Sequence, residues 1–441
     1  MRTMYSSGSH TALYGEKLTT ADEAVAPVSD GSLLVHGMAL AEPPALLWAF
    51  ANRLRSGDLR TLRVFSGPAN PCAMDTVLAV DLADRVERCS AFVGAADRGM
   101  VHVGLSYYVP NHFYQLPRLI AECMEVDVVA TTVSPMDRAG FFTFGTANDF
   151  ISTAARSAKR LIVEVNEHMP RVHGDSRIHV SEVSAVVEHH VPLPEMPRSE
   201  PNAAEIAIAR TIAGLVPDGA TIQLGIGTVP NAVCAFLADR RDLGIHTELF
   251  CQGMVDLIRA GVATGARKTL HPGKHVFTIA VGDRELLDFM HDNPAVESYP
   301  VSYTNHPAVI ARNDNMVSIN AVLEVDLLGQ ANAEVLRGQQ FSGAGGQLDF
   351  VRGAFDARGG KSILAFESTA RGATVSRIVP RLSEQSVVTT PRNDTHLLVT
   401  EFGVANLKGR STRERALAII EIAHPAFRED LLRAAEETYL I

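Results

Sequence analysis

Short runs of β-branched residues alternate with amphipathic segments along this chain, and this alternation limits its fold more than any other feature. In the first part of the chain the strand-like runs include SLLVHGM, TLRVFSG and VDVVATTVS, and the helix-like segments between them include LLWAFANRL and ISTAARSA. Strand–helix–strand order with apolar strands predicts a parallel sheet that helices cover on both faces. The sequence therefore predicts an α/β fold.

A proline-rich segment divides the chain into two parts. Residues 191–201, VPLPEMPRSEP, hold four prolines in eleven residues, and such a segment can neither continue a helix nor pair inside a sheet. After it the alternation restarts with AAEIAIARTIAGLV and TIQLGIG. A chain of 441 residues is also too long for one ordinary core. We expect two open, mostly parallel α/β domains of similar pattern, residues 1–195 and 196–441, joined by this linker.

Composition and charge exclude several classes of protein. A net charge of −10 disfavours binding to nucleic acid or to an anionic membrane, because both need a basic surface. The N-terminus, MRTMYSSGSH, lacks the apolar core of a secretion signal, and no run reaches the ~18 apolar residues that span a bilayer. Five scattered cysteines without a CxxC pair argue against a disulfide framework or a zinc ribbon. We expect a cytoplasmic protein without a metal; a homo-oligomer is compatible with the sequence.

Glycines end the strand-like run TIQLGIG. Gly225 and Gly227 stand at a predicted strand-to-helix corner, where backbone N–H groups and the helix N-terminus can hold a phosphate or carboxylate. The pattern is similar to a dinucleotide-binding fingerprint, but Pro230 stands where the third glycine of that fingerprint should be. A nicotinamide-dependent oxidoreductase is therefore an alternative interpretation, and a non-catalytic ligand-sensing domain is another.

A carboxylate and a second glycine loop follow in the same half of the chain. Glu248 stands at the end of the predicted strand LGIHTEL, and open α/β sheets bind their ligands beyond the carboxyl ends of the strands. The residues alone favour a surface role for a single glutamate at such a place. Gly343, Gly345 and Gly346 suit a backbone nest that presents N–H donors to an anion, or a flexible loop. Two basic segments, residues 259–275 and 407–415, could hold a phosphate or be solvated surface.

Long motifs spread in one order over nearly the whole chain carry a resemblance to a known family. They are FVGAADRGMVHVGLSYYVPNHFYQLPRL, VSPMDRAGFFTFG, EVNEHMPRVHGDSRIHVSEV, GIGTVPNAV, HTELFCQGMVDL, INAVLEVDLLGQANAE, FSGAGGQLDFVRGA, ESTARGATVSRIVP and VTEFGVANLKGRSTRERA. In these motifs the sequence resembles the acetyl-CoA hydrolase/transferase family, which contains 4-hydroxybutyrate, butyrate and succinate CoA-transferases.

The resemblance implies an enzyme that transfers coenzyme A between an acyl-CoA and a small carboxylic acid. It implies that Glu248 is the catalytic glutamate, and that Asn305 and the backbone N–H of Gly346 form the oxyanion hole, with Asn320 as the alternative to Asn305. The glycine loops would lie against the CoA through Gly225, Gly227, Pro230, Asn231, Gly343 and Gly345. Apart from the substrate coenzyme A, no dissociable cofactor and no metal are then expected.

Some features remain open under this resemblance. Glu324, in LEVDL, is interpreted as a structural ion-pair partner rather than as a catalytic residue. Where many members of the family carry Ser-Asp-Gly, this chain has Cys251-Gln252-Gly253, a change that could alter the charge of the pocket.

The substrate is the second open point. Tyr107, Tyr108, His36 and Gly37 could line the acyl pocket or be core and turn residues. Acetyl-, butyryl- and succinyl-CoA are the expected donors. Acetate, butyrate, 4-hydroxybutyrate, succinate and itaconate are all candidate acceptors, and a hydrolase that uses water instead of an acid is the alternative within the family.

Overall fold

The computed structural model describes residues 7–196, 200–225 and 227–441. Contacts divide the chain into unit 1, Met1–Met196 with Phe277–Tyr303, and unit 2, Pro197–Val276 with Thr304–Ile441. The first boundary falls within the predicted linker, of which residues 197–199 lie outside the described residues. The return of Phe277–Tyr303 to unit 1 was not expected, because a single linker predicts a single crossing between the domains.

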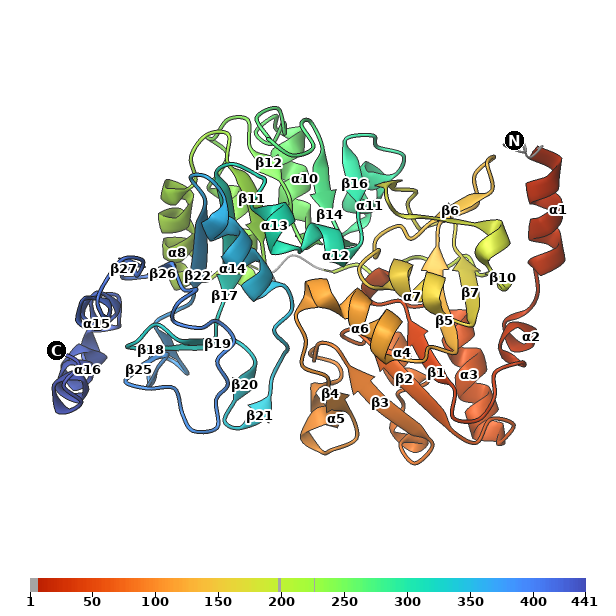
Figure 1. Cartoon of the computed structure of the whole chain (residues 1–441), viewed down its shortest axis with the longest axis horizontal. Helices are drawn as coiled ribbons and strands as arrows, with labels where there is room; N and C mark the ends of the chain where they lie inside the picture. Colours follow the sequence, from red (N-terminus) through yellow and green to blue (C-terminus); the bar gives the residue numbers. More distant parts are fainter. Residues whose placement is uncertain (1–6, 197–199, 226) are drawn as a thin grey trace. The chain divides into compact units, whose positions relative to one another are not determined.

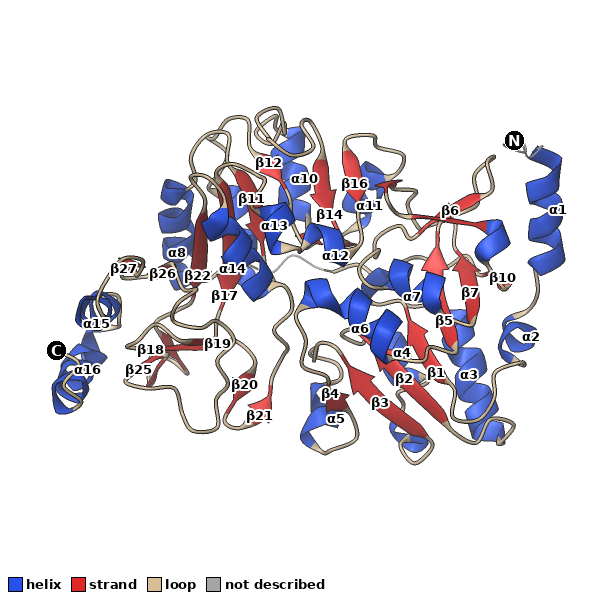
Figure 2. Ribbon diagram, viewed as in Figure 1, coloured by secondary structure: helices blue, strands red, loops and turns tan. Residues whose placement is uncertain are grey.

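Unit 1 is built on a sheet that has seven strands within the described residues, all parallel to their neighbours (Figures 1 and 2). In spatial order the strands are β10 (Ala185–Glu188), β7 (Arg160–Val165), β5 (Val128–Val133), β1 (Leu33–His36), β2 (Leu62–Ser66), β3 (Val86–Ser90) and β4 (Tyr107–Tyr108). The inner strand β5 is buried along its whole length. Such uniform burial is typical of a parallel sheet with both faces covered.

Helices of unit 1 cover both faces of this sheet. On one face, Phe50 and Leu54 of α3 (Pro44–Ser56) pack with Val64 of β2. The next residue of β2, Phe65, points to the other face and lies against Phe150 at a ring-centroid distance of 6.2 Å. Phe150 immediately precedes α7. The other helices of this unit are α1 (Ser7–Lys17), α2 (Ala21–Val25), α4 (Pro71–Asp75), α5 (Arg98–His102), α6 (Leu116–Cys123), α7 (Ile151–Ser157) and α11 (Arg284–Met290).

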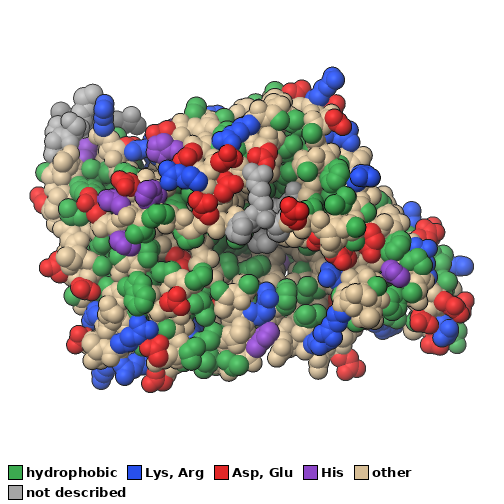
Figure 3. Space-filling model, turned by 180° about the vertical axis from the view of Figure 1, so that it is seen from behind, with side chains coloured by type: hydrophobic (Ala, Val, Ile, Leu, Met, Phe, Trp, Pro, Cys, Tyr) green, Lys and Arg blue, Asp and Glu red, His purple; other side chains and the backbone are tan. Residues whose placement is uncertain are grey.

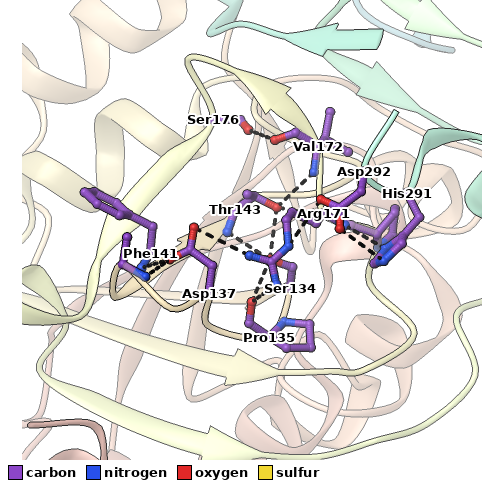
Figure 4. A network of polar contacts seen from close by, with 12 residues as sticks. Ser134, Pro135, Asp137, Phe141, Thr143, Arg171, Val172, Ser176, His291 and Asp292 are labelled. Atoms are coloured by element: carbon purple, nitrogen blue, oxygen red, sulfur yellow. Dashed lines mark hydrogen bonds and ion pairs between the residues drawn. The ribbon is translucent and has the colours of Figure 1, made fainter. Parts of the chain in front are cut away.

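Arg171 ties the returning segment, residues 277–303, to the rest of unit 1 (Figure 4). Its guanidinium lies 3.6 Å from Asp137 Oδ2 and 3.4 Å from Asp292 Oδ1. The backbone N–H of Arg171 donates to Nδ1 of His291 (3.3 Å), and the carbonyl of Arg171 accepts from the N–H of Asp292 (2.9 Å). We call these residues the Arg171 network. It joins two of the family-like motifs to a segment more than 100 positions away.

Unit 2 is built on a sheet that has six strands in the described part of the chain. In spatial order they are β12 (Gly244–Ile245), β11 (Thr221–Leu224), β17 (Met316–Ala321), β22 (Lys361–Ala365), β26 (Leu397–Thr400) and β27 (Gly403–Asn406). The first five are parallel, and β27 is antiparallel to β26. The expected fold class, α/β with mostly parallel sheets, is confirmed.

The helices of unit 2 pack against this sheet and against one another. They are α8 (Ala203–Leu215), α9 (Thr228–Ala235), α10 (Gln252–Arg259), α13 (Pro307–Ile310), α14 (Gln347–Asp356), α15 (Thr412–Glu421) and α16 (Pro425–Glu437). After the linker, Asn202 starts α8: its side chain accepts from the N–H of Glu205, whose carboxylate accepts from the N–H of Asn202. Phe350 and Ala354 of α14 pack with Met316 of β17.

Besides four short 3₁₀ helices (Ala39–Ala41, Val80–Leu82, Phe113–Gln115 and Val180–Glu182), the remaining regular structure of the described residues consists mainly of short strands. They are β6 (Phe141–Thr143), β8 (His173–Gly174), β9 (Arg177–His179), β13 (Leu249–Phe250), β14 (His275–Phe277), β15 (Ile279–Ala280), β16 (Val296–Ser298), β18 (Glu324–Asp326), β19 (Ala331–Asn332), β20 (Val335–Leu336), β21 (Gln339–Gln340), β23 (Thr369–Ala370), β24 (Val375–Ser376) and β25 (Ile378–Val379), together with the one-turn helix α12 (Val301–Thr304). The last of these ends directly before Asn305.

Candidate active site

Glu248 lies just beyond the carboxyl end of β12, the edge strand of the unit 2 sheet. The backbone before it is fixed on both sides, because His246 N–H donates to the carbonyl of Ile222 (3.2 Å) and Thr247 N–H donates to the carbonyl of Val276 (2.9 Å). Both His246 and Thr247 are fully buried, whereas the side chain of Glu248 is partly exposed. The carboxylate therefore stands on a rigid support at the edge of the sheet where ligands are expected.

Asn305 reaches Glu248 from a distant part of unit 2. It is fully buried between α12 and α13, and its Nδ2 donates to Oε2 of Glu248 over 2.6 Å. Helix α13 begins two residues after Asn305. Its N-terminus is capped by His306, whose ring Nδ1 accepts the N–H of Ala308 (3.2 Å). The amide is thus held at a tight corner between two helices.

Asn320, the alternative to Asn305, has a different partner. At the end of β17 its amide exchanges two hydrogen bonds with that of Gln223 on β11, one of 3.1 Å and one of 3.2 Å. The structure therefore brings Asn305, and not Asn320, into hydrogen-bonding contact with Glu248.

Gly346 meets the same carboxylate with its backbone. It is the residue before α14, and its N–H donates to the carboxylate of Glu248. A Cβ atom at this position would overlap both Oε2 of Glu248 and Nδ2 of Asn305. Only glycine leaves room for the three groups to meet, so the sequence predictions of Glu248, Asn305 and Gly346 converge on one place in the fold.

Burial and hydrogen bonding act on Glu248 in opposite directions. Burial raises its pKa to about 7 from an ordinary value of 4.5, although hydrogen bonds from the Asn305 amide and the Gly346 N–H favour the ionised form. Both donors are neutral. At neutral pH the carboxylate is therefore close to its midpoint of ionisation, as is common for a reacting group.

The first glycine loop lies beside this place on the sheet. Gly225 follows β11, and its N–H donates to the carbonyl of Ile319 (2.8 Å). A side chain here would crowd Oδ1 of Asn320, because a Cβ atom would lie 2.7 Å from it. Gly227 has φ +133° and directly precedes α9. Ile226 lies outside the described residues.

Pro230 and Asn231 both belong to α9. Pro230 is buried in the first turn of the helix, where its missing N–H would have had no partner within the helix. This explains why proline can stand where a dinucleotide-binding loop has glycine. Asn231 is also a residue of α9, but its side chain lies outside what the structure describes. The roles predicted for this loop in CoA binding therefore stay predictions.

The second glycine loop leads directly into α14. Its start is anchored by the N–H groups of Phe341 and Ser342, which both donate to the carbonyl of Glu334 (2.7 and 3.0 Å). Gly343 is buried, and Gly345 has φ +51°, a backbone conformation that favours glycine. This chain path turns the N–H of Gly346 toward Glu248.

Three residues of the two basic segments are used within the protein. Lys268 is buried, and its Nζ donates to the carbonyls of Ile245 (2.8 Å) and Lys274 (2.7 Å). In the other segment, Lys408 Nζ lies 3.9 Å from the centroid of the Phe355 ring, and the Arg415 guanidinium donates to three backbone carbonyls. Over the face in Figure 3, basic side chains are interspersed with acidic ones. Lys268 and Arg415 are structural residues rather than a ready phosphate site.

The residues suggested for an acyl pocket lie in unit 1. His36, at the end of β1, is fully buried, with Nδ1 2.8 Å from the carbonyl of Gly37. A side chain on Gly37 would overlap the Ala41 carbonyl. Tyr107 and Tyr108 form the edge strand β4, and Tyr107 is exposed. His36 and Gly37 thus fit the core and turn interpretation.

Glu324 and Cys251 also find partners inside unit 2. Oε1 of Glu324 accepts from Nδ2 of Asn332 (3.0 Å) and from the hydroxyl of Ser386. The prediction of an ion pair is therefore wrong, because neutral donors bind this carboxylate. The predicted structural role agrees with these contacts. Cys251, where the chain departs from the family pattern, directly precedes α10, and its sulfur is hydrogen-bonded to that of Cys234.

Sequence reasoning missed two residues that support the site. The Nε2–H of His246 donates to the carbonyl of Thr304 (2.8 Å), and Gln223 holds Asn320 beside the Gly225 corner. One feature could have pointed to His246: it stands two positions before Glu248, a spacing that puts both on the same side of an extended strand.

The described residues were also compared with what a metal site and a membrane span require. Among the described residues, no group of three or more His, Cys, Asp and Glu side chains is arranged to hold a metal ion. In the same part of the chain, none of the helices combines the length and the apolar character needed to cross a membrane.

The sequence of this chain is similar to that of one family of known proteins. The N-terminal domain of the acetyl-CoA hydrolase/transferase family matches residues 4–197, and the C-terminal domain of that family matches residues 282–435. A 4-hydroxybutyrate coenzyme A transferase of Clostridium kluyveri is 43% identical over 429 residues, which are 97% of this chain and 99% of the relative. A succinyl-CoA:cyclohexane-1-carboxylate CoA transferase of Geobacter metallireducens is 42% identical over 422 residues, 96% of this chain and 95% of the relative.

A solved structure matches the whole architecture. The crystal structure of RipA from Yersinia pestis superposes with a TM-score of 0.94 at 52% sequence identity, covering 98% of this chain and 100% of RipA.

Proposed function

The chain belongs to the acetyl-CoA hydrolase/transferase family and is a CoA-transferase, and from this premise we propose that Glu248 carries CoA as a thioester between an acyl-CoA and a small carboxylic acid. One observation supports this role above the others. The Asn305 amide, at 2.6 Å, and the Gly346 N–H both donate to the Glu248 carboxylate, although the three residues come from distant positions in the sequence.

In the first half-reaction Glu248 acts as a nucleophile. An oxygen of its carboxylate attacks the carbonyl carbon of the acyl-CoA, and the CoA thiolate leaves, so that a mixed acyl-glutamyl anhydride remains. The thiolate then attacks the glutamyl carbonyl and expels the first acid as its carboxylate, which leaves CoA on Glu248. A partly dehydrated carboxylate with a pKa of about 7 is suited to the first step, because little hydration has to be removed before it attacks.

In the second half-reaction the acceptor acid reverses these steps. Its carboxylate attacks the glutamyl thioester, the thiolate leaves, and the thiolate then attacks the acyl carbonyl of the new anhydride. The new acyl-CoA departs and the Glu248 carboxylate is restored. Because the first acid leaves before the second one reacts, the kinetics are expected to be ping-pong.

The neutral donors on Glu248 fit the tetrahedral states of this sequence. When a thiolate or a carboxylate adds to the glutamyl carbonyl, negative charge develops on the glutamyl oxygen that Asn305 and Gly346 already contact. Donors that are fixed before the reaction need no reorganisation, and one such donor typically lowers the barrier by about 2.7 to 4 kcal/mol. The remote part of the CoA adds binding energy that can be used to form the reactive anhydride.

The acceptor belongs to the small carboxylic acids. The relatives named above act on 4-hydroxybutyrate and, with succinyl-CoA, on cyclohexane-1-carboxylate. We therefore propose a panel of acetate, butyrate, 4-hydroxybutyrate, succinate, itaconate and cyclohexane-1-carboxylate with acetyl-, butyryl- and succinyl-CoA as donors. Mass spectrometry of the acyl-CoA products ranks the acids directly.

The covalent intermediate provides the main test. The enzyme is incubated with an acyl-CoA in the absence of any acceptor acid, and its intact mass is measured. CoA should be attached, and digestion should place it on the peptide that holds residues 246–253. Borohydride should inactivate the enzyme only after acyl-CoA has been added. Glu324→Gln is the matched control, because Glu324 is also a hydrogen-bonded carboxylate of unit 2. The proposal is wrong if wild-type enzyme never gains the mass of CoA and borohydride has no effect.

Hydrolysis by water is the second candidate, since the family description names hydrolases and transferases together. A hydrolase would release CoA at the same rate with and without an added acid, and its adduct would decay in buffer. A transferase should keep the adduct until an acid is supplied. The oxidoreductase interpretation of the Gly225–Asn231 corner is not retained, because the chain belongs to a CoA-transferase family.

A further inference from the structure

His246 lies two residues before Glu248 on the extension of β12, and its side chain is fully buried. Nothing in the proposed reaction uses it, and a buried histidine is most simply a core residue. Its contacts, however, lead to both groups that donate to Glu248. We propose that His246 is a positioning residue, whose imidazole holds the Asn305 amide and the start of α14 against the Glu248 carboxylate. This inference rests on the proposed function of Glu248.

The first contact leads to Asn305. Nε2–H of His246 donates to the carbonyl of Thr304 over 2.8 Å, and Thr304 is the residue directly before Asn305. Thr304 and Asn305 are both fully buried, so their backbone has little freedom to shift. The carbonyl and the amide side chain belong to consecutive residues at the corner between α12 and α13. Loss of the imidazole donor would therefore release the corner that sets the 2.6 Å bond from Asn305 to Glu248.

The second contact leads to Gly346. The His246 ring lies beside the Phe350 ring, with a centroid distance of 6.4 Å. Phe350 is in the first turn of α14, and its N–H donates to the carbonyl of Gly346 (3.0 Å). The imidazole thus packs on the helical turn whose first residue presents the N–H that Glu248 accepts.

The charge state of His246 suits a fixed donor. Burial lowers its pKa to about 3, and the positive charge of Lys268 acts in the same direction, as does His271. Lys268 is itself held nearby, with Nζ 2.8 Å from the carbonyl of Ile245. A carbonyl can only accept, so the proton of the neutral ring must be on Nε2. His246 therefore keeps one tautomer and one hydrogen bond throughout the working pH range.

Two substitutions separate a positioning role from a packing role. His246→Gln keeps an N–H donor at about the reach of Nε2, whereas His246→Asn keeps the same amide chemistry but is too short to reach Thr304. His275→Asn is the matched control, because His275 is a second buried histidine of unit 2, with a pKa that burial lowers to about 4. For each variant we would measure the melting temperature, kcat, the KM for acyl-CoA, the rate of CoA adduct formation and the pH profile of kcat/KM.

We expect His246→Asn to lower kcat and the rate of adduct formation by about 100-fold, with the KM for acyl-CoA nearly unchanged, because a shift of about 1 Å in a catalytic donor has effects of this size. The acidic limb of kcat/KM should move to higher pH, since the hydrogen bond from Asn305 lowers the pKa of Glu248. His246→Gln should stay within several-fold of wild type and keep the wild-type limb. His275→Asn should change the melting temperature alone.

Several results would overturn the inference. They are a His246→Asn variant with wild-type kcat and pH limb, an equal loss in the Gln and Asn variants, or a shift of the limb in His275→Asn. If His246→Asn does not fold, the folded Gln variant decides: an unchanged limb supports positioning, and a shifted limb contradicts it. Glu248→Ala is measured alongside. If Glu248→Ala still forms the adduct, the proposed function fails; if it does not, and His246→Asn behaves as wild type, only the role of His246 is withdrawn.

Discussion

The Arg171 network of unit 1 and the Glu248 site of unit 2 each join polar groups from three separate segments of the chain, but they treat charge differently. In the Arg171 network a guanidinium lies between two carboxylates, 3.6 Å from Asp137 and 3.4 Å from Asp292. In the Glu248 site one carboxylate meets two neutral donors, and burial raises its pKa to about 7.

This difference suggests that the Arg171 network stabilises the fold, whereas the Glu248 site is suited to a reaction. Ion pairing with two carboxylates stabilises the charged guanidinium and leaves it unreactive. A carboxylate that loses hydration and gains only neutral donors has a raised proton affinity, and the folded protein must hold it there at some cost in stability. Both places lie in motifs that resemble the same family, so resemblance alone does not tell the structural motif from the reactive one.

Replacement of Glu248 should have the largest effect. Glu248→Ala should lower kcat by about 10⁴-fold or more, because the variant lacks the proposed nucleophile. Glu248→Asp should lose about 100-fold or more, since the shorter side chain withdraws the attacking oxygen by about 1 Å. Transfer assays with acyl-CoA and each acid measure the loss. Glu324→Gln, which keeps the acceptor for Asn332, should stay close to wild type. A folded, inactive Glu324→Gln beside an active Glu248→Ala would reverse the assignment.

Gly346→Ala should have the second largest effect. The added methyl group would overlap Oε2 of Glu248 and Nδ2 of Asn305, so the carboxylate and its donors must move apart. We expect kcat to fall by about 10²- to 10³-fold, the usual loss on removal of one oxyanion donor. Gly214→Ala is the control, because a Cβ at this position in α8 meets nothing within 4 Å. Equal kcat values in the two variants would contradict the close contact of Gly346 with Glu248 and Asn305.

Arg171→Met should affect stability rather than catalysis. It removes the cation between Asp137 and Asp292, and we expect a loss of about 1–3 kcal/mol in the free energy of unfolding, as for other partly buried charged groups that lose a partner. Denaturant unfolding measures this loss, and kcat per folded molecule should not change. Arg118→Met, which removes an exposed ion pair with Glu122, should cost less than about 0.5 kcal/mol. A large fall in kcat without destabilisation would show that the Arg171 network is not merely structural.

The pH dependence of stability should show the smallest effect. The pKa of Glu248 is raised in the folded state, so the folded protein binds its proton more tightly, and stability is lost as the pH rises from about 4.5 to about 7. In Glu248→Gln this loss is absent. Relative to wild type, the variant should therefore gain about 1–2 kcal/mol between pH 4.5 and 8, with the partial exposure of the side chain limiting the gain. Unfolding of both proteins at several pH values measures the difference. If the difference in the free energy of unfolding between the two proteins does not change with pH, the Glu248 carboxylate is not desolvated.

The activity of the wild-type enzyme should depend on the same group. If the carboxylate of Glu248 is the attacking form, as proposed, kcat/KM should rise with pH through about 7 and level off above it. An acidic limb near the ordinary pKa of a glutamate, 4.5, would contradict the desolvated site.

Local sequence patterns were sufficient for much of this protein. Strand-like runs separated by amphipathic segments predicted mostly parallel sheets, because side-chain periodicity reports which faces an element buries. Glycines at 225, 227, 345 and 346 marked the corners that carry unusual or crowded backbone. Long motifs identified the family and, through it, predicted a catalytic role for Glu248. Each of these inferences depends on residues that are close together in the chain.

Other properties were decided by contacts between distant residues. Asn305 and Asn320 are equivalent in sequence terms, and only the packing of α12 and α13 puts the first on Glu248 while Gln223 takes the second. In the sequence Lys268 belongs to a basic segment, whereas in the structure its Nζ donates to two backbone carbonyls. The return of residues 277–303 to unit 1 brings Asp292 to Arg171 and pairs β16 with β8. The physical reason is common to all three: burial and hydrogen-bond partners are set by where the chain returns in space, and a linear pattern does not contain that information.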